Sequence, residues 1–131
     1  MKLLLDTHIW IWSLCDVKRL GKRTIRMLRS EQNELWLSPI SVWEFLIFAQ
    51  KGRLTLEMDP KAWLVEAMKR APMKEAPLSY EIAIESRFVE LPHQDPADRF
   101  LAATAKILDL TLVTTDERLM HSRDFSVLAN P

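Results

Sequence analysis

Short apolar runs alternate along this chain with longer segments whose apolar residues recur at helical spacing. The short runs predict strands at residues 2–5, 35–37, 73–78, 110–114 and near 125–128. The longer segments predict helices at residues 7–14, 21–32, 40–50, 60–70, 80–88 and 96–109, followed by a short helical turn after Asp116. Residues 7–14 also contain Ile and Trp, so a strand competes with the helix there.

Local start and stop signals support these boundaries. Ser38-Pro39, Asp59-Pro60 and Asp95-Pro96 each combine a capping side chain with a proline that the first helical turn accepts. Gly52 supplies a stop signal for the helix over residues 40–50. These signals mark the starts of three helices and the end of one.

Strands that alternate with helices indicate an α/β fold with a mainly parallel sheet covered on both faces. The 131 residues contain no internal repeat and no linker, so we expect a single domain over residues 1–131. In sheets of this kind, ligands bind beyond the carboxyl ends of the strands. Asp6 and Asp116 follow two of the predicted strands, which places both acids at that edge.

The composition narrows the classes of function. Lys+Arg and Asp+Glu number 18 each, and this balance is weak evidence against a strongly basic nucleic-acid binder. With 2 glycines, the chain offers no glycine-rich phosphate loop. Cys15 is the only cysteine, which excludes an intramolecular disulfide and a cysteine-rich zinc site. We therefore expect a cytoplasmic protein, and since no apolar stretch approaches membrane length, we expect no membrane partner.

Three acids near predicted helix starts have a sufficient structural explanation. Asp6 and Asp116 each follow a strand and can act as the N-cap of the next turn. Asp98 falls in the first turn after Asp95-Pro96, where the helix dipole favours an acid. Asp98 also aligns with Leu101 at helical spacing, so we expect its side chain on the core side of that helix.

Glu44 is harder to explain as a structural residue. The capping box Ser41-x-x-Glu44 is the alternative, but Pro39 indicates that the helix has already begun. Glu44 shares a helical stripe with Ile40 and Ile47, and a dehydrated carboxylate there needs a cation or donors to compensate it. Carboxylates that lie close together repel one another, and a site built in this way usually holds a cation. We therefore predict a site for a hard divalent ion at Asp6, Glu44, Asp98 and Asp116.

Four segments carry these acids in a definite order along the chain. They are Leu-Leu-Leu-Asp-Thr-His (3–8), Ile-Ser-Val-Trp-Glu-Phe (40–45), His-Gln-Asp-Pro-Ala-Asp-Arg-Phe-Leu-Ala-Ala-Thr-Ala (93–105) and Leu-Val-Thr-Thr-Asp (112–116). They resemble the PIN-domain ribonucleases and, among these, the VapC-type toxins of type II toxin–antitoxin modules. The resemblance extends from Lys2 to about Asp124, and four acid-bearing motifs in the right order make it highly specific.

The resemblance implies an α/β/α sandwich and a pocket for Mg²⁺ or Mn²⁺. Its catalytic and metal-binding acids carry over to Asp6, Glu44, Asp98 and Asp116. Thr7 and Thr115 match the hydroxyl positions beside the first and last acids, as possible supporting residues. Arg99 follows Asp98, as in many relatives, and either orients a carboxylate or contacts a phosphate. A bound ion lowers the pKa of a water and so supplies hydroxide for hydrolysis of a phosphodiester.

The resemblance implies a metal-dependent endoribonuclease toxin. Transfer RNA or ribosomal RNA as substrate, a cognate antitoxin as inhibitor and a homodimer as the assembly are the expected partners. Two alternatives stay open: a non-catalytic PIN-like module that binds RNA or protein, and a metal-dependent DNA nuclease, since metals and carboxylates do not read the 2′-hydroxyl. The basic residues between Lys18 and Arg29 fit a solvated helix face, RNA contact or an acidic antitoxin segment.

Overall fold

The structure, a computed structural model, describes residues 1–130 and is built around one sheet. The strands are β1 (Lys2–Leu5), β2 (Glu34–Leu37), β3 (Lys74–Glu75), β4 (Thr111–Thr114) and β5 (Ser126–Ala129). They lie in the order β3-β2-β1-β4-β5, and every neighbouring pair is parallel. The predicted α/β fold is confirmed, and the sheet is parallel throughout rather than mainly so.

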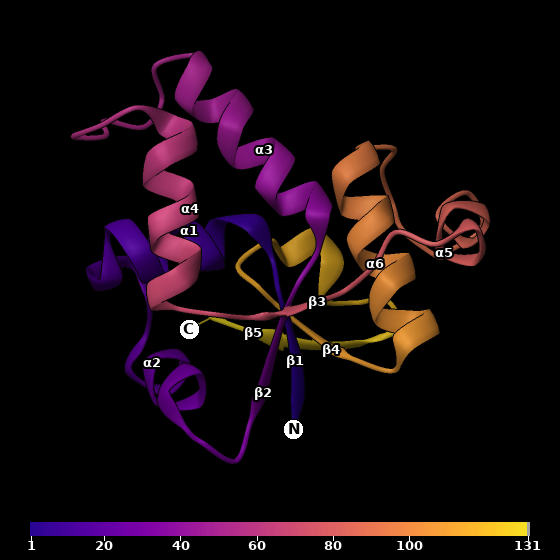
Figure 1. The fold of residues 1–131 in the computed structure, drawn as a ribbon. Helices are drawn as coiled ribbons and strands as arrows, with labels where there is room; N and C mark the ends of the chain where they lie inside the picture. Colours follow the sequence, from indigo (N-terminus) through magenta and orange to yellow (C-terminus); the bar gives the residue numbers. More distant parts are fainter. Residues whose placement is uncertain (131) are drawn as a thin grey trace.

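Helices cover both faces of this sheet. They are α1 (Thr7–Cys15), α2 (Lys22–Arg29), α3 (Pro39–Gln50), α4 (Pro60–Arg70), α5 (Tyr80–Glu85) and α6 (Pro96–Leu108), with 3₁₀ turns η1 (Val17–Arg19) and η2 (Glu117–Leu119). In Figure 1, α1, α2 and α4 lie on one side of the sheet and α5 and α6 on the other. Within residues 1–130, no helix has the length and apolar character needed to cross a membrane.

The alternation of side chains along β1 explains this layered arrangement. Leu3 and Leu5 belong to one hydrophobic cluster, together with Ile9 of α1 and Phe45 of α3. Leu4 points to the opposite face and packs in a second cluster with residues of α6. Because successive strand residues face opposite sides, these three consecutive leucines pack in two cores, one on each face of the sheet. Burial of each leucine side chain stabilises the fold by about 2 kcal/mol.

Three predicted elements are shorter in the structure. The strand predicted over residues 73–78 contracts to β3, since Pro77 has no N–H with which to continue the ladder. The helix predicted over residues 21–32 ends at Arg29, and a turn then leads into β2. The helix predicted over residues 80–88 ends at Glu85 and continues as a turn.

The order of the strands reverses direction where β1 meets β4. The chain adds β2 and β3 on one side of β1 and then returns to place β4 on the other side. Ligand sites in parallel sheets lie at such a switch point, beyond the carboxyl ends of the strands. α3 starts at the carboxyl end of β2 and packs against both α1 and α6, so it spans the two helical layers beside this switch point.

Candidate metal centre

Asp6 stands at the switch point, directly after β1. Its backbone N–H donates to the carbonyl of Val113 at 3.0 Å, which joins it to β4. As the N-cap of α1, it accepts the backbone N–H of Thr7 on Oδ1 at 2.7 Å. Its Oδ2 accepts the hydroxyl of Thr114 at 2.5 Å. Burial raises the pKa of Asp6, and the two hydrogen bonds oppose that rise by favouring the charged form.

Glu44 reaches the same place from the second turn of α3. Ser38, not Ser41, caps this helix by accepting the N–H of Ile40 at 3.1 Å, so the capping-box alternative for Glu44 is wrong. The Thr7 hydroxyl donates to Glu44 Oε1 at 2.5 Å, and the Ser41 hydroxyl lies 2.8 Å from that of Thr7. Burial raises the pKa of Glu44, and the negative charge of Asp6 raises it further.

Asp98 is the most perturbed of the acids. It lies in the first turn of α6, and the Asp95 side chain caps that helix by accepting the N–H of Asp98 at 3.3 Å. Burial, joined by the charges of Asp6, Asp95, Asp116 and Glu44, raises the pKa of Asp98 to about 7. The carboxyl of Asp98 therefore keeps its proton to a much higher pH than an ordinary aspartate does. The charges of Asp6, Glu44 and Asp116 all act on Asp98, so the structure brings the four predicted acids close to one another.

Asp116 follows β4 and pairs with an arginine that the sequence analysis did not single out. Its Oδ1 caps η2 by accepting the N–H of Arg118 at 3.0 Å. The guanidinium of Arg118 then donates from Nε to Oδ1 at 3.0 Å and from Nη2 to Oδ2 at 2.7 Å. These bonds lower the pKa of Asp116, and Arg118 Nη2 also lies 3.9 Å from Asp98 Oδ2. Asp-x-Arg across a predicted helical turn is the sequence signal that identifies this pair.

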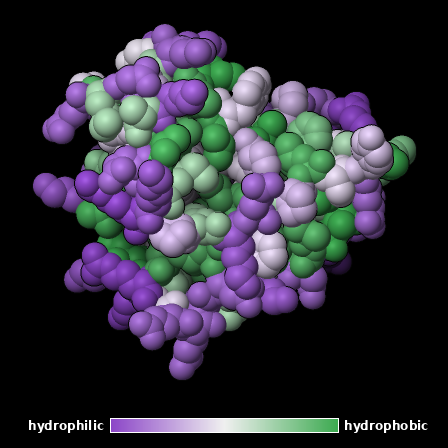
Figure 2. Space-filling model, in the orientation of Figure 1, coloured by the Kyte–Doolittle hydropathy of each residue, from purple (hydrophilic) through white to green (hydrophobic). Residues whose placement is uncertain are grey.

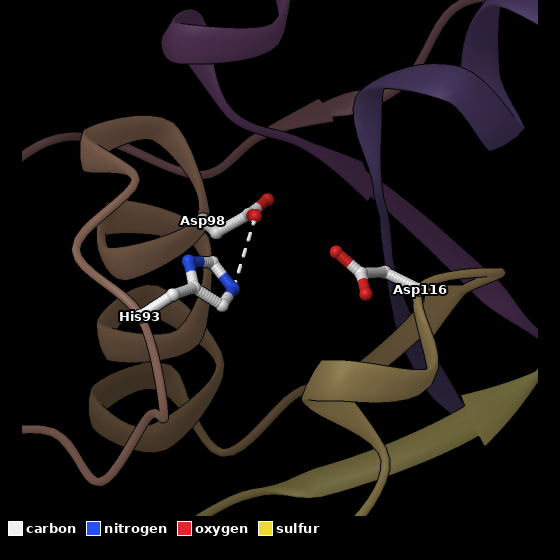
Figure 3. A group of neighbouring side chains, drawn as sticks. All are labelled: His93, Asp98 and Asp116. Carbon is white, nitrogen blue, oxygen red and sulfur yellow. Dashed lines mark ion pairs between the residues drawn. The ribbon is translucent and has the colours of Figure 1, made fainter.

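His93 completes the wall of the site. Its Nδ1 accepts the backbone N–H of Asp95 at 3.2 Å, so the proton of the neutral ring sits on Nε2. Nε2 faces Asp98 Oδ2 at 3.5 Å, which is too long for a strong hydrogen bond. In Figure 3, His93 and Asp98 face Asp116 across a gap. One ligand atom from each of the three lies within 4.8 Å of the others.

Two of the predicted supporting residues have other surroundings than expected. Thr114, the last residue of β4, is buried and donates to Asp6, whereas the predicted Thr115 is partly exposed. Arg99 is buried and neither orients a carboxylate nor faces a substrate. Its guanidinium donates to the carbonyls of Ser86 (2.7 Å), Val89 (2.9 Å) and His93 (3.0 Å). Arg99, which lies on α6, therefore fastens the turn that follows α5 onto α6 by these hydrogen bonds.

The donor set fits a hard divalent cation. Carboxylate oxygens from four different elements meet at one edge, and hydroxyl or backbone donors hold Asp6, Glu44 and Asp116 in place. Burial and mutual repulsion disfavour ionisation of Asp6, Glu44 and Asp98. A cation relieves both effects, because it replaces lost hydration and cancels like charge.

Comparisons with known proteins agree with this geometry. The family model for the PIN domain matches residues 3–125. The chain is 29% identical over 123 residues to ribonuclease VapC22 of Mycobacterium tuberculosis, with 92% of this chain and 91% of the relative covered.

Solved structures show the same fold. VapBC2 of Rickettsia felis, bound to a DNA fragment from its promoter, contains a chain that matches with a TM-score of 0.73 at 15% identity, over 98% of both chains. DNA-bound VapBC of Salmonella typhimurium matches with a TM-score of 0.72 at 15% identity, over 100% of this chain and 99% of that one.

Proposed function

Because the chain belongs to the PIN-domain family, we propose that it is a metal-dependent endoribonuclease, the toxin of a toxin–antitoxin module, formed by one domain over residues 1–131. The observation that carries this proposal is the meeting of Asp6, Glu44, Asp98 and Asp116 at the switch point of the sheet. The 29% identity with a VapC ribonuclease supports RNA as the substrate.

In this proposal, Asp6, Asp98 and Asp116 hold Mg²⁺ or Mn²⁺, and Glu44 either joins them or orients the attacking water. The bound ion supplies the acidity that ionises a water for attack on the phosphodiester. Thr114 and Thr7 position Asp6 and Glu44 through the hydrogen bonds described above. His93 accepts the backbone N–H of Asp95 on Nδ1, so in the neutral ring its Nε2–H points toward Asp98 and is not free to act as a metal ligand.

Two partners follow from the same proposal. Solved complexes of VapB with VapC share this fold, which supports a cognate antitoxin as the inhibitor. A second copy of the chain is supported by an apolar face at α5, where Tyr80, Ile84 and Phe88 recur every four residues and are 91%, 63% and 75% exposed. Figure 2 shows hydrophobic side chains reaching the surface on this side of the molecule.

The deciding experiment is cleavage by the purified chain. Structured RNA and DNA are incubated with Mg²⁺ or Mn²⁺ and then with chelator, beside the variants Asp6→Asn and Asp98→Asn. Asp109→Asn, at the far end of α6, is the matched control, because Asn tolerates the left-handed conformation there (φ 54°).

We expect RNA cleavage that requires the metal, disappears in the two site variants and persists in the control. RNA cleavage that survives chelation or both site substitutions would overturn the mechanism. Cleavage of DNA alone would identify a DNA nuclease, and binding without cleavage in either metal would identify a non-catalytic module.

A further inference from the structure

A cavity of about 310 Å³ lies beside the acids, between α1 and the end of α3. Its lining includes three aromatic rings, those of His8, Trp12 and Phe48, and two guanidinium groups, those of Arg19 and Arg53. None of these side chains takes part in the acidic site described above. Such a combination of rings and cations is unusual for a surface whose only task is to be solvated.

The rings form a continuous path that starts at the acids. His8 stands two residues after Asp6, in the first turn of α1. Trp12 lies one turn after His8 on α1, with ring centroids 5.8 Å apart. Phe48 lies one turn after Glu44 on α3, and its ring is 5.5 Å from that of His8.

Cations close the outer end of the path. The guanidinium of Arg19 lies 4.7 Å from the centre of the Trp12 ring, and that of Arg53 lies 5.8 Å from the centre of the Phe48 ring. Asp16 also lines the cavity, so two arginines face one carboxylate and the lining stays positive. Positive charge here contrasts with the negative charge of the acids.

Nucleic acid matches this combination better than a peptide does. Unpaired bases stack on aromatic rings and on guanidinium planes, while arginines neutralise the phosphates between them. An acidic peptide satisfies the arginines but has no need of three rings in a row. We propose that this cavity binds an unpaired nucleotide of the RNA strand beside the scissile phosphate, with its base on Trp12 and Phe48 and its phosphate near Arg19 and Arg53. The inference rests on the proposed function, since it assigns part of the same substrate.

The test measures binding, separately from cleavage. Anisotropy of a labelled, unstructured oligoribonucleotide is followed in chelator, so that no hydrolysis competes. Trp12→Leu keeps an apolar side chain but removes the stacking surface, and we expect its Kd to rise about 5- to 100-fold. Trp12→Phe retains a ring and should stay near the wild type, which separates stacking from a merely structural role of Trp12.

The arginines are tested through their salt dependence. Arg19→Gln and Arg53→Gln should each weaken binding and reduce the slope of log K against log salt by about 0.7, the value for one phosphate contact on a single strand. Arg123→Gln, an exposed arginine in the connection to β5, is the matched control and should leave the slope unchanged.

Unchanged RNA affinity in Trp12→Leu and in both arginine variants would overturn the proposal, as would a lack of RNA binding by the wild-type chain. Loss of affinity for a polyglutamate peptide, with RNA affinity intact, would make the cavity a peptide site and would also overturn it. If the wild-type chain cleaves RNA and the variants bind RNA normally, this inference is refuted and the proposed nuclease function is not. Variant-sensitive binding by a chain that never cleaves RNA refutes the proposed nuclease instead.

Discussion

Replacing Asp98 by Asn should stabilise the metal-free protein, by an amount that grows with pH. In the folded protein, burial and four neighbouring acids raise the pKa of Asp98 from 3.8 to about 7. Asn has nearly the same shape and never ionises, so Asp98→Asn removes the cost of that charge and little else. The exposed fraction of the Asp98 side chain is 15%, so solvent screens this cost only in part.

The direction of the pH dependence follows from proton binding. Between pH 4 and pH 7, the unfolded chain has released the proton of Asp98 while the folded protein still holds it. Folding is therefore favoured at low pH, and the free energy of unfolding falls as the pH rises through this window. The total loss is about 4 kcal/mol, of which about 2 kcal/mol falls between pH 5 and pH 7.

Thermal unfolding in chelator measures this effect. We expect the melting temperature of Asp98→Asn to exceed that of the wild type by a margin that widens by about 7 °C from pH 5 to pH 7. Asp6 and Glu44, whose pKa values are also raised, contribute pH dependence to both proteins. Because their charges interact with Asp98, the difference between the two proteins measures the ionisation of Asp98 together with these interactions. Asp109→Asn serves as the control and should follow the wild type.

The reasoning is refuted if the margin between Asp98→Asn and the wild type stays constant with pH, or narrows as the pH rises. Saturating Mn²⁺ at pH 7 supplies an independent check. If Asp98 helps to hold the ion, Mn²⁺ raises the melting temperature of the wild type by more than that of the variant. Equal stabilisation of the two proteins would remove Asp98 from the proposed ligand set.

Two further predictions concern the arginines near the site. Arg118→Ala should lower the Kd for Mn²⁺ several-fold in titration calorimetry, because Arg118 donates to both oxygens of Asp116 that an ion would use. Arg123→Ala is the control. An unchanged or weaker affinity of Arg118→Ala for Mn²⁺ would contradict the prediction. Arg99→Met should lower the free energy of unfolding by about 3 kcal/mol or more, since two buried carbonyls and one partly buried carbonyl lose a charged donor. Urea unfolding measures this loss, and near-wild-type stability of Arg99→Met would show that Arg99 does not hold the turn.

The class of the fold, the family and the starts of the helices could all be inferred from the order of residues along the chain. Ser38-Pro39, Asp59-Pro60 and Asp95-Pro96 were expected to open helices, and in the structure each capping side chain accepts a backbone N–H two or three residues ahead. Such bonds are local, so a short stretch of residues contains all the information they need. The same local signals predict that Asp6, Asp95 and Asp116 cap helices, and the structure confirms all three caps. Asp6 and Asp116 cap a helical turn and also lie in the acidic site.

The surroundings of each acid depend on how the chain folds. Thr114 and Asp6 are 108 residues apart in the chain, and Thr7 and Glu44 are 37 apart, yet these pairs orient two of the four carboxylates. The sequence placed an arginine next to Asp98, but folding turns Arg99 into the core and brings Arg118 to the acids instead. The pKa of Asp98 likewise depends on burial and on the charges of Asp6, Glu44 and Asp116, which come from three other segments. Packing and electrostatics act through space, and the order of residues alone does not contain those distances.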